Sequence, residues 1–274
     1  MYRRYTRKTA GLDLATFLVG LVILFPVYLM VINSVRSDLD YGNWLVPPEQ
    51  PAWGNFAEAW SQANLGYALA NSLIITVVSI VLIVGVSATA SYPLARLTAG
   101  WSKGVYLLFI LGLLLPFQLA LVPLYVTFRN LGLLGNPLGL ILLYVGLQAP
   151  FSIFLYTEFL RGIPREYDEA AQVDGCKPVE LFWRVLMPLL RPITGTVVIL
   201  NAIHVWNDFY PPLLFLSGSP VQTLPLAVYK FTGTYASQWG LIFSSLILSA
   251  VPVLVAFIIM QKAVFRGYSS GIKG

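Results

Sequence analysis

The chain has 274 residues, of which 57% are hydrophobic and only 11% are charged. Soluble domains carry about 25% charged residues, so this low charged fraction excludes an ordinary soluble protein. The mean hydropathy of +0.74 indicates several membrane spans. The net charge of +5 does not require a nucleic-acid partner, because Lys and Arg also accumulate on the cytoplasmic loops of membrane proteins. The single cysteine, Cys176, excludes an internal disulfide framework.

Six apolar segments are long enough to cross the roughly 30 Å hydrocarbon core of a bilayer, which takes about 20 helical residues. They cover residues 12–34, 68–90, 105–128, 138–159, 193–216 and 239–260. We therefore expect an all-α membrane protein with six transmembrane helices in one domain, residues 1–274. The first segment is too long for the apolar core of a signal peptide, and no small-residue cleavage site follows it. We interpret it as a retained anchor.

Basic residues predict the orientation of these segments. Placing both termini in the cytoplasm puts 14 of the 17 Lys and Arg residues on that side. The exceptions are Arg36, Arg129 and Lys230. This bias is the usual topology signal, and an even number of spans agrees with it.

Prolines interrupt the last four apolar segments, at Pro116, Pro123, Pro150, Pro211, Pro212 and Pro252. Each removes an intrahelical hydrogen bond and tends to kink the helix. At membrane depth, such breaks persist where protein or a cavity satisfies the backbone. A solute pathway and ordinary helix packing both provide this, and the prolines alone do not separate the two.

The polar segment 160–191 lies between the fourth and fifth apolar segments and is patterned as two short helices. Pro164 suits the first helical position. Glu166, Asp168 and Glu169 then fall in the first turns, where the helix dipole favours acidic side chains. Gly175 suits the left-handed residue that ends a helix.

The second helix of this segment begins at Pro178. Four residues, Val179, Phe182, Trp183 and Leu186, repeat at i, i+3, i+4 and i+7 and predict an apolar stripe along one side. Glu180 and Arg184 form an i, i+4 pair away from the stripe, and Pro188 and Pro192 end the helix.

Helices this short are marginal in water, so they need a surface to pack on. One candidate surface is the lipid headgroup layer. The other is a soluble partner, whose backbone could approach closely at the small residues Ala170 and Ala171.

The spacing of this segment resembles a known signature. Glu169-Ala170-Ala171, three residues, Gly175, nine residues and Val185-Leu186-Met187-Pro188 resemble the EAA motif of binding-protein-dependent ABC importer permeases. The family usually has Ile-x-Leu-Pro at the end, from which Val185 and Met187 depart conservatively. The motif also precedes the fifth of six spans, as it does in that family.

Further matches are Trp206-Asn207-Asp208-Phe209, Thr223-Leu224-Pro225 and residues 261–274. Together they resemble the carbohydrate-uptake branch, in particular the six-span subunit similar to the second maltose permease. The resemblance covers nearly the whole chain and is most specific from Leu160 onward.

The resemblance implies a type I ABC importer permease fold in the bacterial cytoplasmic (inner) membrane, and translocation of a sugar or oligosaccharide. Residues 160–191 would form the coupling loop that docks on an ATPase. There Glu169 would meet a basic residue, Ala170 and Ala171 would allow close packing, Gly175 would make the turn and Pro188 would close the motif. The tail residues Gly271, Lys273 and Gly274 would reach between two ATPase subunits.

The implied partners are a second permease subunit, two copies of a cytoplasmic ATPase, an external solute-binding protein and membrane lipid. The sequence has no Gly-x-x-x-x-Gly-Lys-Ser/Thr phosphate loop. We therefore expect a transport subunit that is not an enzyme and binds no cofactor, with ATP and Mg used by the partner ATPase. His204 is the only histidine, so no histidine-based metal site is expected.

Ionisable groups inside a bilayer cost at least about 2.5 kcal/mol and are functional candidates. The polar residues of the fifth apolar segment are Asn201, His204, Asn207 and Asp208, and Gln118 and Gln148 are weaker candidates of the same kind. At helical spacing Asn201, His204 and Asp208 can share one face that lines a solute pathway. Hydrogen bonding between helices is the alternative.

Two other classes compete with an ATP-driven importer. A secondary transporter driven by an ion gradient normally shows inverted repeats and intramembrane carboxylates, but no clear repeat is present and Asp208 is nearly alone. An intramembrane enzyme lacks support, because neither His-Glu-x-x-His nor Gly-x-Ser-x-Gly occurs. A pathway poor in Lys and Arg favours a neutral sugar over a phosphorylated one.

Overall fold

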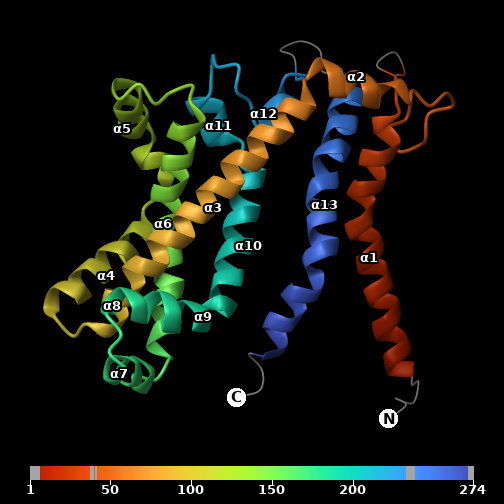
Figure 1. Ribbon diagram of the computed structural model, residues 1–274. Coiled ribbons are helices and arrows are strands. Elements are labelled where there is room, and N and C mark those ends of the chain that lie inside the picture. The colour runs from red at the N-terminus through yellow and green to blue at the C-terminus, as the bar shows by residue number, and fades with distance from the viewer. Residues whose placement is uncertain (1–6, 38–39, 41, 233–237, 271–274) are drawn as a thin grey trace. The chain divides into compact units, whose positions relative to one another are not determined.

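The computed structural model describes residues 7–37, 40, 42–232 and 238–270, and all the regular elements among them are helical (Figure 1). The predicted all-α class is confirmed. Two compact units divide the chain. The first consists of residues 1–67 and 227–258, and the second of residues 68–226 and 259–274.

The first unit contains α1 (Arg7–Ser34), α2 (Gly54–Gln62) and the apolar part of α13 (Trp239–Ser270). These helices contain the predicted segments 12–34 and 239–260. The side chains of α1 that lie within its apolar stretch are mostly exposed in the isolated chain, as expected for a helix in contact with lipid.

A buried arginine organises the loop that follows α1. Arg36 is only 5% exposed, and its guanidinium donates to Asn33 Oδ1 at 3.0 Å, to Asp40 Oδ2 at 2.6 Å and to the carbonyl oxygens of Asn43 and Val46. The five N–H donors of a guanidinium allow such a hub. The sequence interpretation counted Arg36 only as a charge on the external side.

The second unit contains most of α3 (Leu65–Arg96) and the elements that follow it. These are α4 (Gly100–Leu114), α5 (Phe117–Asn130), α6 (Pro137–Arg161), α7 (Glu166–Val173), α8 (Pro178–Glu180), the π-helix η1 (Leu181–Leu186), α9 (Met187–Leu189), α10 (Arg191–Asn207), α11 (Tyr210–Phe215) and the first residues of α12 (Leu224–Tyr229). Helices α3 and α6 contain the predicted segments 68–90 and 138–159. Asn136 caps α6 by accepting from Leu138 N at 2.9 Å, and Pro137 occupies its first turn.

The third apolar segment, expected as one helix over 105–128, is instead two helices. Helix α4 ends at Leu114, α5 begins at Phe117, and their axes differ by 101°. Pro116 explains the break. It lacks an N–H to continue the ladder, and it forces the preceding Leu115 into an extended conformation, with φ −83° and ψ 117°.

The fifth segment, expected over 193–216, is also interrupted. Helix α10 ends at Asn207, Asp208 is extended, and the six-residue α11 begins at Tyr210. Pro211 and Pro212 cannot donate to the carbonyls of Asn207 and Asp208, so two consecutive hydrogen bonds of a continuous helix are impossible. The prediction of a merely kinked helix was wrong here.

Among the described residues, three helices are long and apolar enough to cross a membrane alone: Gly11–Ser34, Leu65–Arg96 and Pro137–Arg161. The pair α4 and α5, and the pair formed by Pro178–Leu189 and Arg191–Asn207, meet the same test as bent spans. Trp239–Val255 is a shorter apolar helix. The predicted segments 12–34, 68–90 and 138–159 therefore reappear as single long helices, 105–128 and 193–216 are broken, and 239–260 lies within α13.

Helix α6 is central to the core of the second unit. Near its beginning, Leu140 and Tyr144 pack with α5 and with Phe215 of α11. Near its end, Tyr156 and Leu160 pack with Val197 of α10 and with the polar loop. The hydroxyl of Tyr156 donates to Thr194 Oγ1 at 3.0 Å. Helix α10 runs beside α6 (Figure 1).

Gly139 in the first turn of α6 allows a close backbone approach. A Cβ at this position would lie 2.1 Å from the carbonyl oxygen of Leu133. We expect Gly139→Ala to lower the free energy of unfolding by about 1–3 kcal/mol, the usual cost of overpacking, measured by denaturant titration in detergent. Gly146→Ala on the same helix is the control, since its Cβ would meet nothing within 4 Å. Equal stability of the two variants would contradict this account.

Candidate functional site

The first helix of the polar loop ends where its sequence suggested, but it begins two residues later than expected. Helix α7 begins at Glu166, because the N–H groups of Asp168 and Glu169 bond to the carbonyl oxygen of Arg165. Pro164, expected at the first helical position, instead precedes the helix. Gly175 has φ +81°, as predicted for the residue that ends it.

The second helix of the loop differs from the prediction. Residues Leu181–Leu186 form a π-helix, in which each hydrogen bond reaches the fifth residue and not the fourth. As a result Leu181 and Leu186, five residues apart, are both buried together with Phe182. Val179 and Trp183 are 68% and 50% exposed, so the predicted i, i+3, i+4, i+7 stripe was wrong at two of its four positions.

Helix α7 has two faces. Asp168 and Ala171 are its only buried residues, at 7% and 5% exposure. On the other side, Glu166, Glu169, Ala170 and Val173 are exposed at i, i+3, i+4 and i+7, and Val173 is 88% exposed. We call these four residues the outer face of α7.

This burial changes the expected partner patch. Ala170 is available to a partner, whereas Ala171 packs inside the chain's own core. That core joins the loop residues Leu181, Phe182 and Leu186 to Ala88 of α3 and to Leu160 of α6. The loop therefore packs against α3 and α6 of its own chain, and the outer face of α7 remains available to a partner.

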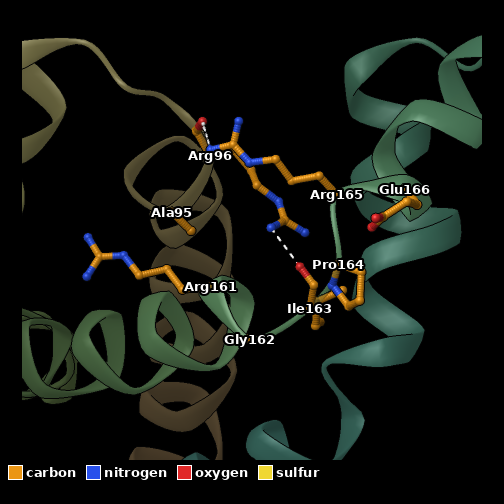
Figure 2. Close-up of a pocket in the computed structure, with 8 residues that line it drawn as sticks. All are labelled: Ala95, Arg96, Arg161, Gly162, Ile163, Pro164, Arg165 and Glu166. Carbon is orange, nitrogen blue, oxygen red and sulfur yellow. Dashed lines mark hydrogen bonds between the residues drawn. The ribbon is translucent and has the colours of Figure 1, made fainter.

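An open pocket of about 520 Å³ lies where α3 and α6 end and α7 begins (Figure 2). It is lined by Ala95, Arg96, Arg161, Gly162, Ile163, Pro164, Arg165 and Glu166. Arg96 Nη1 donates to the carbonyl oxygen of Ile163 at 2.9 Å, and Arg165 Nη2 donates to that of Arg96 at 3.1 Å. Arg161 points away from both in Figure 2 and pairs with Glu158 at 2.6 Å.

Arg96 also forms an ion pair that the sequence did not reveal. Its Nη2 lies 2.8 Å from Asp168 Oδ2, and each side chain is only 10% exposed. The approach does not follow a hydrogen-bond direction, so the contact is mainly electrostatic. Arg96 and Asp168 are 72 positions apart in the sequence, and no local pattern could have connected them.

The polar residues of the fifth segment divide into two environments. Asn201 is 2% exposed, and its Nδ2 donates to Ser152 Oγ of α6 at 3.1 Å and to Val197 O at 2.8 Å. For this residue the structure favours hydrogen bonding between helices. His204 is 54% exposed, and its Nε2 lies 3.9 Å from Asp208 Oδ2.

The remaining candidates are spread over several elements. Asn207 is exposed and donates to Ile203 O at 2.8 Å. Gln118 lies on α5 and Gln148 on α6. Tyr144, which the sequence interpretation did not single out, is buried within electrostatic reach of Asp208. The tail residues Gly271, Lys273 and Gly274 lie outside the described residues.

Within the described ranges, no group of three or more His, Cys, Asp or Glu side chains could hold a metal ion. What the structure offers is a set of long apolar helices, a polar break beside Asp208, and a loop with an anchored inner side and an exposed outer face. These features are those of a helical membrane protein with several membrane-spanning segments.

The comparison with known families identifies the family within this class. The family described as "Binding-protein-dependent transport system inner membrane component" matches residues 82–269. The chain belongs to this family. It is thus a multi-pass inner-membrane permease subunit and not itself the ATPase of such a system.

Curated relatives match almost end to end. The melibiose/raffinose/stachyose import permease protein MelC of Bacillus subtilis (strain 168) is 33% identical over 272 residues, covering 97% of this chain and 99% of that protein. The probable starch degradation products transport system permease protein AmyC of Thermoanaerobacterium thermosulfurigenes is 33% identical over 262 residues, covering 94% and 95%.

Among solved structures, a chain from the crystal structure of a bacterial ABC transporter involved in the import of the acidic polysaccharide alginate is similar. The TM-score is 0.81 with 20% sequence identity, covering 95% of this chain and 99% of that one. At this identity the likeness concerns the fold, and it confirms the type I permease architecture.

The conformation of Gly175 leads to a prediction. Because φ is +81° and a Cβ would meet nothing within 4 Å, a side chain adds backbone strain without a clash. We expect Gly175→Val to destabilise the loop by about 1–2 kcal/mol, the cost of left-handed backbone for an L-residue. Gly175→Asn should cost less, since Asn tolerates this region. Limited proteolysis within residues 160–191 measures the difference, and equal cleavage rates would contradict it.

The environment of Asn201 gives a second prediction. Asn201→Leu removes the bond to Ser152 Oγ and should lower the free energy of unfolding by about 0.6 kcal/mol, typical of hydrogen bonds between membrane helices. It should leave the apparent affinity for solute unchanged. A changed KM at unchanged stability would instead place Asn201 in the solute pathway.

Proposed function

We propose that this chain is the translocation subunit of an ATP-binding-cassette importer for a sugar or oligosaccharide. The observation that carries the proposal is the family match over residues 82–269, together with near full-length likeness to permeases whose names specify saccharides. A third such relative is the multiple sugar-binding transport system permease protein MsmG of Streptococcus mutans, at 33% identity over 257 residues.

The proposal assigns partners to the chain. A second permease subunit completes the pathway, two copies of a cytoplasmic ATPase bind ATP and Mg, and an external binding protein delivers the solute. Both termini then lie in the cytoplasm, which agrees with the distribution of Lys and Arg. The loop 160–191 lies on the same side as the ATPase.

The geometry of α7 supports a docking role. Glu166 and Glu169 give its outer face negative charge, Ala170 allows a close approach, and Val173 offers an exposed apolar contact. The inner side of the loop is fixed to α3 and α6 through a packed core. A displacement of the ATPase can therefore reach the membrane helices through this loop, provided that each ATPase state makes different contacts with it.

The solute class follows from the polar residues near the break after α10. None of the six candidates is Lys or Arg, and one of them, Asp208, is acidic. An anionic saccharide would find no Lys or Arg partner among these candidates, whereas hydroxyl groups can bond to His204, Asn207 and Asp208. We therefore propose a neutral sugar or oligosaccharide, with these three residues on the pathway.

The test is uptake by the complex reconstituted in proteoliposomes with its ATPase, its second permease and its binding protein. We expect uptake of radiolabelled oligosaccharide to require internal ATP and to persist when ion gradients are collapsed. Uptake that follows a proton or sodium gradient without ATP would favour a secondary transporter. No uptake with ATP present would contradict the proposal.

A variant connects this test to the loop. Gly175→Asp places a charged side chain on left-handed backbone at the end of α7, and should abolish uptake while the protein remains inserted in the membrane. Gly146→Ala, on an open position of α6, is the control and should transport normally. Normal uptake by Gly175→Asp would argue against coupling through this loop.

A further inference from the structure

Helix α7 is attached to its own chain by very little apolar contact. Of its eight residues only Asp168 and Ala171 are buried. An alanine side chain buries little area, so hydrophobic packing along α7 contributes only weakly. The larger buried side chain is the carboxylate of Asp168, and its ion partner is Arg96.

Arg96 is the last residue of α3, the 32-residue helix Leu65–Arg96. Its guanidinium contacts two places in the loop at once. Nη1 bonds to the carbonyl oxygen of Ile163 before α7, and Nη2 lies against Asp168 within α7. In return, Arg165 Nη2 donates to the carbonyl oxygen of Arg96. Arg96 at the end of α3 thus contacts the loop, and Arg165 just before α7 contacts the end of α3 in turn.

The same end of α3 also contacts the second half of the loop. The ring of Tyr92, one turn before Arg96, lies 5.9 Å from the ring of Phe182 in η1. Ala88 of α3 is in the core formed by Leu181, Phe182 and Leu186. The η1 segment is thus held by apolar packing, whereas α7 depends on charge.

We propose that the Arg96–Asp168 ion pair is the joint that transmits movement of α7 to α3, with both acting as positioning residues. This inference rests on the proposed function and adds the element through which the coupling passes. At 10% exposure, solvent and salt screen the pair only weakly. Loss of either partner leaves an uncompensated buried charge, so α7 would move without α3.

A neighbouring pair provides a matched control. Arg161 and Glu158 are 2.6 Å apart at the same end of α6, but their side chains are 38% and 46% exposed and both belong to one helix. Both residues also contact Tyr106 of α4, whose hydroxyl donates to Glu158 and whose ring centroid lies 4.4 Å from the Arg161 guanidinium carbon. This pair therefore links α6 to α4, and does not link α7 to α3. Glu158→Gln should therefore leave coupling unchanged.

The first experiment measures solute transported per ATP hydrolysed by the reconstituted complex, normalised to the amount of assembled complex. Asp168→Asn and Arg96→Gln should each lower this ratio by about tenfold, within the usual range of coupling free energies, while ATP hydrolysis continues. The charge-reversed double variant, Arg96→Asp with Asp168→Arg, should recover part of the ratio. A role in folding alone would reduce the amount of complex and leave the ratio intact.

The second experiment observes the joint itself. Spin labels on Leu97→Cys and Gln172→Cys, both exposed positions outside the outer face of α7, are introduced into a Cys176→Ala background. The distance between them should be the same with and without ATP in the otherwise native complex, and should change on ATP binding in the Asp168→Asn variant. A distance that changes in the native complex would overturn the proposal.

The two experiments separate the two levels of inference. A native complex without ATP-dependent uptake contradicts the proposed function. A native complex with normal uptake, whose Asp168→Asn and Arg96→Gln variants keep the native ratio, contradicts only the joint. If the single variants do not assemble, Arg96→Lys is measured in their place. It retains the positive charge but has one nitrogen, which cannot contact both Ile163 and Asp168 as the guanidinium does. It should give an intermediate ratio of solute transported per ATP, and a native ratio would overturn the proposal.

Discussion

The bilayer's inability to hydrogen-bond the backbone is the constraint on which the rest of this structure depends. Each N–H and C=O at membrane depth must find a partner within the protein, and helices achieve this within one segment. The described chain accordingly contains long apolar helices. Its departures from helix occur where proline makes the backbone bond impossible, as at Pro116 and at Pro211 with Pro212.

The break at Pro211 and Pro212 has a chemical consequence. It ends α10 at Asn207 and leaves Asp208 on extended backbone beside His204. Polar side chains and non-helical backbone thus occur together in an otherwise apolar segment. Such a combination is tolerated where protein or a water-filled cavity surrounds it, which agrees with a solute pathway near this point.

The polar loop combines two different attachments. The η1 segment is held by an apolar core, whose strength depends on area and not on direction. Helix α7 is held mainly by a buried ion pair, whose strength depends on charge and burial, and by hydrogen bonds from two arginine side chains to backbone carbonyls, whose strength depends on geometry. These contacts can transmit a displacement while leaving the outer face of α7 free for a partner.

The sequence by itself determined the helical class, the approximate position of the apolar segments and the turn at Gly175. These follow from local rules: hydropathy over about 20 residues, and the conformational freedom of glycine. The spacing from Glu169 to Pro188 also pointed to the correct family. Only the tertiary structure decided that two apolar segments are broken, and that Ala171 faces inward while Ala170 faces outward. It also decided that Leu181 and Leu186 share a face through a π-helix, and that Asp168 pairs with Arg96 72 positions away. The reason is that burial and ion pairing depend on which helices meet in space, and a sequence pattern reports only the neighbours along one helix.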